Sequence, residues 1–298
     1  AWIERLRGNR QAAVERMRAA LAEAPGYYWG WARLADWLAE DRDYAGYLQA
    51  ATQMVRLAPR NAVAYGYLGE AQLRSNDRAA AKASFHRALE LSPDYPFAGL
   101  SLFDLQLEDL DIPGAVRTIE VLRQHGPGPL VWARQIQLAA KRGRLDDALA
   151  GLAELAKADT TDALPFDVAV EALCKKGWVR PAAEKLIQEL DNPNVGCLVG
   201  RTLMDLLLGH ASDWRWQQYL HGLPGALALW RLRRWRRRTV PAVLAKIAGK
   251  GELERRALTL YLESTSELGR ADEVRRFIAG PARLLRQDAR LWGAAAYA

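Results

Sequence analysis

Residues 62–95 read AVAYGYLGEAQLRSNDRAAAKASFHRALELSPDY, and this stretch decides the fold. Apolar residues recur in it at helical spacing in two runs, which a polar turn around Asn76 separates. Small residues stand where two helices would cross closely, and a proline ends the second run because it disfavours helical geometry in the residue before it. The residues that carry the pattern are Tyr65, Leu68, Gly69, Gln72, Ala81, Phe85, Ala88 and Pro93. The stretch therefore predicts two antiparallel helices joined by a short turn.

The same pattern recurs along most of the chain. Helix-ending prolines occur at a constant spacing of 34 residues, at Pro25, Pro59, Pro93 and Pro127. Glycines that suit the turn between two helices occur at the equivalent position of three repeats, namely Gly8, Gly143 and Gly177. One repeat between Gly8 and Gly143 is a residue shorter than the others. One departure is Tyr47, which stands where the pattern expects an alanine at a helix crossing.

This unit resembles the tetratricopeptide repeat, a 34-residue helix-turn-helix. The resemblance implies an all-α fold, a right-handed superhelical solenoid of stacked helix-turn-helix repeats, with about eight hairpins in this chain. A lone hairpin cannot bury its apolar face, so stacked hairpins form the core. The resemblance also implies a protein-protein interaction scaffold.

Three segments are expected from the strength of the repeat. Residues 1–194 keep a clear 34-residue spacing, residues 195–254 form a degenerate helical segment with an arginine- and tryptophan-rich run, and residues 255–298 resume the repeat. Gly196 and Gly200 in the degenerate segment predict close packing between two helices. Both chain ends fall within a repeat and neither resembles a polar cap, so we expect the chain to be a segment of a larger protein.

Composition excludes several classes of protein. No apolar run reaches 18 residues, so the sequence predicts no membrane span. Cys174 and Cys197 provide no disulfide framework, which favours a reducing compartment, and we expect a cytoplasmic protein. The net charge is +7, but residues 227–298 carry 16 Lys and Arg against 7 Asp and Glu. The basic character is therefore local, and residues 1–226 have a net charge of −2.

Signatures of enzymes are missing from the sequence. The four histidines form no His-Glu-x2-His arrangement and do not stand at metal-ligand spacing from the cysteines. Gly249-Lys250 is similar to the end of a phosphate-binding loop, but Leu244 replaces its first glycine and Gly251 its Ser or Thr. No pair of carboxylates can be singled out as acid and base. We therefore expect no catalysis, no metal and no cofactor.

In the tetratricopeptide-repeat family, the first helix of each repeat lines the concave, ligand-binding face. Asp36, Glu70 and Asp104 share one position of successive repeats and form an acidic stripe, beside an apolar row. The apolar row comprises Trp29, Val63, Phe97 and Leu130. The residues expected to bind a peptide are Trp29, Arg33, Asp36, Glu40, Glu70, Arg74, Phe97, Asp104, Glu108 and Arg134.

The charge of this face indicates the ligand. Family members that clamp the C-terminal carboxylate of a ligand use Lys and Asn at two positions of the first helix. This chain has Ala32 and Asp36 at these positions in one repeat and Gly66 and Glu70 in the next, so a C-terminal carboxylate is not the expected ligand. A charged groove favours the opposite sign, which predicts a basic peptide. The alternative is that these acids form an ordinary solvated helix face.

A second feature is the run WRLRRWRRR at residues 230–238, which contains Arg231, Arg233, Arg234, Arg236, Arg237 and Arg238. Close arginines on a helix repel one another, so an opposite charge should offset them. Three interpretations stay open: contacts within this chain or with solvent, an acidic protein partner, and a nucleic acid whose bases stack on the tryptophans.

The main functional hypothesis is a scaffold that binds a peptide or protein partner along its concave face. One alternative is a nucleic-acid-binding helical repeat that uses residues 231–238. Another is an accessory region that recruits substrate for an enzyme domain outside this chain.

The pattern generates a first testable prediction. Helix content should exceed about 65%, with no sheet, and Leu68, Ala81, Phe85, Trp132 and Ala148 should be buried. Phe85→Ala should lower the free energy of unfolding by roughly 3–5 kcal/mol, because it leaves a cavity between the two helices. A loss of less than about 1 kcal/mol in urea unfolding would mean that the positions of the repeat are misassigned.

Overall fold

The computed structural model describes residues 1–208 and 223–267. Helices occupy more than three quarters of these residues, and none of them lies in a strand, which confirms the all-α prediction. The chain divides into two compact units, residues 1–127 and residues 128–298. In residues 255–298, where the sequence predicts that the repeat resumes, three of the residues that fit the pattern lie outside the described residues, namely Gly269, Val274 and Trp292.

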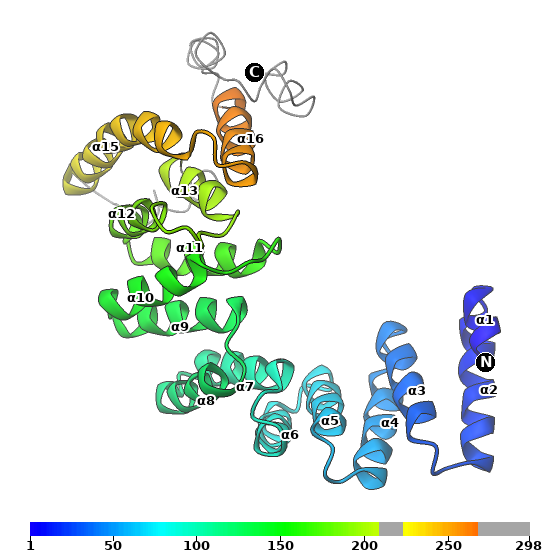
Figure 1. The fold of residues 1–298 in the computed structure, drawn as a ribbon. Helices are drawn as coiled ribbons and strands as arrows, with labels where there is room; N and C mark the ends of the chain where they lie inside the picture. Colours follow the sequence, from blue (N-terminus) through cyan, green and yellow to red (C-terminus); the bar gives the residue numbers. More distant parts are fainter. Residues whose placement is uncertain (209–222, 268–298) are drawn as a thin grey trace. The chain divides into compact units, whose positions relative to one another are not determined.

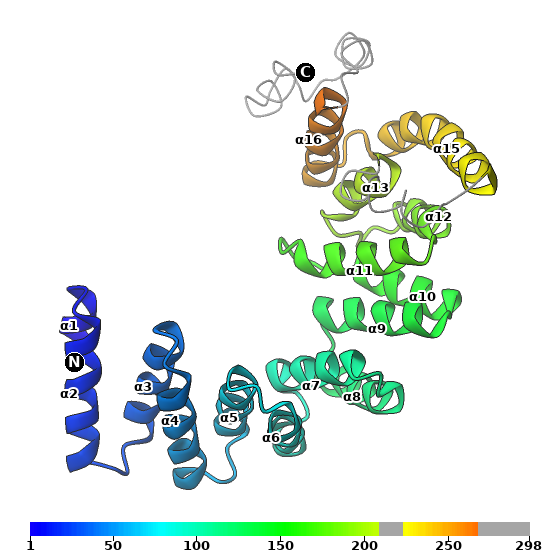
Figure 2. The same cartoon turned by 180° about the vertical axis from the view of Figure 1, so that it is seen from behind.

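The first unit consists of helix-turn-helix pairs in which each helix packs against its successor (Figures 1 and 2). Its helices are α1 (Trp2–Leu6), α2 (Arg10–Glu23), α3 (Tyr28–Glu40), α4 (Tyr44–Leu57), α5 (Ala62–Arg74), α6 (Arg78–Leu91), α7 (Pro96–Glu108) and α8 (Ile112–His125). The quoted stretch thus forms α5 and α6, joined at Asn76 as predicted.

The second unit begins with the same kind of pair and then changes its packing. Its described helices are α9 (Pro129–Arg142), α10 (Leu145–Ala156), α11 (Leu164–Lys175), α12 (Val179–Glu189), α13 (Val199–Leu208), α15 (Leu223–Ile247) and α16 (Glu252–Glu267). Helix α11 packs on α9 and α12 on α10, as stacked repeats require. Beyond α12, however, α13 packs chiefly against α16 rather than against α15, its next described neighbour in sequence.

One backbone conformation recurs at the turn inside each repeat. The second residue after the first helix is left-handed, with φ of 60° at Arg42, 62° at Asn76 and 59° at Leu110. Glycine takes this place at Gly8, Gly143 and Gly177. The next N–H then bonds back across the helix end, for example from Asp77 N–H to the Gln72 carbonyl at 2.9 Å.

An aspartate starts the second helix in three of these turns. The carboxylates of Asp43, Asp77 and Asp111 accept hydrogen bonds from the backbone N–H groups of Gly46, Ala80 and Gly114, respectively. Such a cap satisfies a donor that would otherwise lack a partner, which is worth about 1 kcal/mol. The turn and the cap together fix where each pair of helices reverses.

The helix crossing inside residues 62–95 is as close as the sequence predicts. A Cβ atom added at Gly69 would lie 2.7 Å from the Phe85 ring, so only glycine fits there. Phe85, Ala81 and Ala148 are fully buried, as predicted. Leu68 and Trp132 are only half-buried, which corrects the prediction, because each packs against the edge of a core cluster.

The structure explains how Tyr47 is accommodated where the repeat pattern expects an alanine. Its ring is buried, and its hydroxyl donates a hydrogen bond to Glu70 on α5, 3.2 Å away. The larger side chain therefore does not disrupt the pair but reaches the next repeat. A T-shaped contact with Tyr67, with ring centroids 6.4 Å apart, strengthens the same junction.

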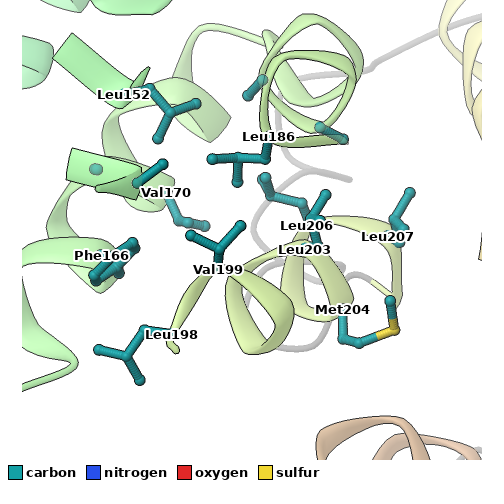
Figure 3. Packing of buried hydrophobic residues seen from close by; sticks show 14 of the residues in the cluster. Leu152, Phe166, Val170, Leu186, Leu198, Val199, Leu203, Met204, Leu206 and Leu207 are labelled. Atoms are coloured by element: carbon teal, nitrogen blue, oxygen red, sulfur yellow. The ribbon is translucent and has the colours of Figure 1, made fainter. Parts of the chain in front are cut away.

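All described helices of the second unit contribute to one apolar core, and Figure 3 shows the part of it between α10 and α13. Phe166 and Val170 of α11, Leu186 of α12 and Leu203 of α13 lie within it. A Cβ atom added at Gly200 would lie 2.5 Å from the backbone oxygen of Leu253, so α13 and α16 approach closely there. This contact confirms the interpretation of Gly200 as a residue for close helix packing.

Substitution of Leu110 tests the energetic cost of the left-handed turn. A left-handed conformation costs a residue with a Cβ about 1–2 kcal/mol, and Leu110 gains little in return because its side chain is 70% exposed. Leu110→Gly should therefore raise the free energy of unfolding by about 0.5–1 kcal/mol, after the greater flexibility of glycine in the unfolded chain is included. Urea unfolding measures the difference. Leu110→Ala is the matched control, because it removes the same exposed side chain but keeps the strain, and an equal gain from both variants would contradict the explanation.

Candidate peptide-binding face

Three large apolar side chains are exposed at the same position of successive repeats. Trp29, Val63 and Phe97 are the second residues of α3, α5 and α7, and they are 72%, 42% and 43% exposed. We call these three residues the apolar row. Leu130, the fourth residue that the sequence assigned to it, belongs to α9 in the second unit.

Neighbouring aromatic rings hold the two large members of the row in place. The Phe97 ring meets Phe85 edge-on, with centroids 6.0 Å apart, and lies 6.1 Å from Tyr95. Trp29 makes a T-shaped contact with Tyr28 at 5.4 Å. Such contacts restrict the rings before any ligand arrives, which lowers the entropy lost on binding.

The acids of the predicted stripe are engaged by neighbouring repeats. Asp36 accepts a hydrogen bond from the Tyr67 hydroxyl at 2.7 Å through one carboxylate oxygen, and its other oxygen lies 3.5 Å from Arg33. Glu70 has the same arrangement, with Tyr47 on one oxygen and Arg74 on the other at 3.4 Å. Each carboxylate is thus shared between a tyrosine of another repeat and an arginine of its own helix.

Burial keeps both tyrosines in the neutral, hydrogen-bond-donating form. It is the main cause that raises the pKa of Tyr47 and of Tyr67 well above the usual value for a phenol, and the adjacent carboxylates raise both further. Burial also raises the pKa of Tyr28 and of Tyr95. The hydroxyls of Tyr47 and Tyr67 therefore remain donors throughout the physiological pH range.

The acids at the ends of the first helices form ion pairs between repeats. Glu40 lies 2.6 Å from Arg5, and Glu108 lies 3.0 Å from Arg78. Asp104 is partly buried and has an interaction within the chain. Of the predicted arginines, Arg33 and Arg74 lie beside the acids, whereas Arg134 belongs to α9 in the second unit and its role in the groove stays a prediction.

An open hollow of about 690 Å³ borders the apolar row at Val63. Its lining comes from the turn between α4 and α5 and from the end of α6, namely Ala58, Pro59, Arg60, Asn61, Ala62, Val63, Leu91 and Ser92. Asn61 caps α5 and also donates a hydrogen bond to the Tyr28 hydroxyl at 3.2 Å. The hollow is large enough to receive a side chain of a ligand that lies on the row.

Sequence reasoning missed Tyr47, Tyr67 and the hollow. Tyr67 holds the position in its repeat that Arg33 holds in the preceding repeat. This position lies on the first helix beside the preceding repeat, which is the signal that could have indicated the contact. The signal for Tyr47 was the departure itself, because a large polar-tipped residue at a small position must direct its hydroxyl to a partner. Nothing in the sequence indicates the hollow.

The arginine run lies on α15. Arg231, Arg234, Arg237 and Arg238 are exposed, Trp235 and Arg236 are partly buried, and the side chain of Arg233 lies outside the described residues. Helix α15 continues through Pro241.

Within the described residues, no group of three or more His, Cys, Asp and Glu side chains is arranged to hold a metal ion. None of the described helices combines the length and the apolar character that crossing a membrane requires.

Comparison with known proteins supports the fold. No family model matches the chain, and no curated protein matches it. Among solved structures, the C-terminal part of a TPR repeat-containing protein from Cytophaga hutchinsonii matches 82% of this chain and 97% of its own length, with 14% identity and a TM-score of 0.51.

Two further structures match over shorter stretches. PilW, described as a widely conserved type IV pilus biogenesis factor, is 19% identical over 64% of this chain and 89% of its own, with a TM-score of 0.47. YrrB, described as a TPR protein with an unusual peptide-binding site, is 19% identical over 60% and 92%, with a TM-score of 0.45. The repeated helix pairs and the Cytophaga match together show that this chain has a helical-repeat fold like that of solved tetratricopeptide-repeat structures.

Proposed function

We propose that the first unit is a protein-interaction scaffold that binds an extended segment of a partner along the apolar row. The observation that carries this proposal is the exposure of Trp29, Val63 and Phe97 at one position of three successive repeats. Single exposed apolar residues are ordinary on protein surfaces, whereas a contiguous set is characteristic of interaction sites. Cys174 and Cys197 are not joined in a disulfide, which supports a reducing, cytoplasmic setting for this role.

The repeat spacing favours an extended ligand. Packed helices lie about 8–10 Å apart, so members of the row on adjacent first helices are separated by at least that distance. An extended or polyproline-type peptide advances about 3.1–3.3 Å per residue, so every third side chain matches the closest spacing. The expected ligand therefore presents an apolar side chain at about every third position.

The carboxylates beside the row favour basic side chains in the ligand. Asp36 and Glu70 are each paired with an arginine that is about half exposed, on the same helix. Exposed pairs of this kind are worth little, so a lysine or arginine of the ligand can replace Arg33 or Arg74 at small cost. Tyr67 and Tyr47 would keep each carboxylate oriented during this exchange.

Selection from a random peptide library displayed on phage tests the row. Peptides that bind the wild-type protein should carry apolar residues at intervals of about three, with Lys or Arg between them. Trp29→Ala and Phe97→Ala should each weaken a selected peptide by tenfold or more, because exposed aromatic anchors dominate such interfaces. Leu164→Ala removes a similarly exposed apolar residue of the second unit and is the matched control. Selected peptides that bind the row variants and the wild type equally would refute the proposal.

The charge of the face is tested on the same peptides. Asp36→Asn and Glu70→Gln remove the charge but keep an acceptor for each tyrosine, so they should slow association without unfolding the unit. Arg74→Gln should act in the opposite direction, because it removes the cation that competes with the ligand for Glu70. Added salt should reduce the differences between these variants. Surface plasmon resonance measures the association rates. Equal rates for all variants would contradict a role of charge and leave only the apolar row as the source of binding.

A further inference from the structure

The exposed side of α15 is a basic surface separate from the apolar row. Arg231, Arg234, Arg237 and Arg238 are all exposed, and their spacing of three, six and seven residues places them on one side of the helix. Helix α15 contains no acidic residue that could pair with them. We call these four residues the arginine face.

The opposite side of α15 fixes the orientation of the arginine face. Val243 and Ile247 are buried in the core of the second unit, and Val240 is 8% exposed. Trp235, which lies four residues after Arg231 and borders the arginine face, also packs against this core, and the guanidinium group of Arg180 lies over its ring at 5.7 Å from the centroid. Because this apolar side anchors the helix, the arginines cannot turn inward without losing core contacts.

Three of the four arginines of this face have no acidic partner among the described residues. No carboxylate of those residues lies within ion-pair distance of Arg231, Arg237 or Arg238. The cations beside α15 do have partners, because Arg180 bonds to Glu184 at 2.7 Å and Lys246 bonds to Asp191 at 2.8 Å.

We infer that the arginine face binds an acidic helical segment of a partner protein. Guanidinium groups pair with carboxylates through two parallel hydrogen bonds, which favours arginine over lysine at such contacts. Seven residues of α15 span about 10 Å, and carboxylates at positions i, i+3 or i+4, and i+7 of a second helix cover the same length. A partner helix that lies along α15 can therefore pair with Arg231, Arg237 and Arg238.

The same geometry favours an acidic protein over a nucleic acid. Single-stranded nucleic acids bind through aromatic side chains that stack on bases, and Trp235 is instead packed against the core and covered by Arg180. Binding of a duplex rests largely on neutralising its phosphates, and one row of four arginines offers few cations for this purpose. The neighbouring cations that would add to the row are already paired.

Labelled peptides of about 20 residues, long enough to form a helix, test the inference with the full chain. One alanine-based peptide carries glutamates along a single face, and a second has the same composition with the glutamates distributed around the helix. Fluorescence anisotropy near physiological salt should show tighter binding of the one-face peptide. Arg231→Gln, Arg237→Gln and Arg238→Gln together should weaken it by tenfold or more.

Two controls make the result specific. Arg56→Gln, Arg117→Gln and Arg142→Gln together change the net charge equally at exposed positions and should leave the affinity unchanged. Circular dichroism should show equal helix content in both triple variants. Tighter binding of a DNA duplex or a single-stranded oligonucleotide that the arginine variant loses would overturn the inference in favour of nucleic acid. Absence of peptide binding, or equal binding by both triple variants, would overturn it as well.

Discussion

The left-handed residue after each first helix is the constraint on which the repeats depend. It ends the helix and turns the chain so that the second helix returns along the first. The turn has nearly the same φ at Arg42, Asn76 and Leu110, so successive pairs reverse in the same way. Equivalent residues of successive first helices consequently share an environment, which is why Trp29 and Phe97 are both exposed.

The acids on the first helices connect repeats as well as offering charge. Tyr67 reaches back to Asp36 in the preceding repeat, and Tyr47 reaches forward to Glu70 in the next. In a repeat protein, stability arises largely from such contacts between neighbours. A ligand that bridges several repeats would add to the same contacts, so binding along the apolar row and the stability of the stack should be coupled.

Much of the fold could be predicted from the sequence because each repeat is determined by local spacing. Gly69 against Phe85 and the turn at Asn76 follow from residue size and backbone preference within one pair. Leu110 could not be assigned its left-handed conformation in this way, because leucine disfavours it and the neighbouring helices impose it. The hydrogen bonds from Tyr67 to Asp36 and from Tyr47 to Glu70 could not be predicted either, because each joins residues more than 20 positions apart.

The break in the repeat explains why the two candidate surfaces differ in kind. Where pairs repeat regularly, one residue per repeat builds a surface that extends across several helices, as the apolar row does. In the second unit, the close approach of Gly200 to Leu253 brings α13 against α16, and the regular order of neighbours ends there. A surface in this part must therefore come from within a single helix, and α15 provides it because its arginines recur every three or four residues opposite the buried Val243 and Ile247.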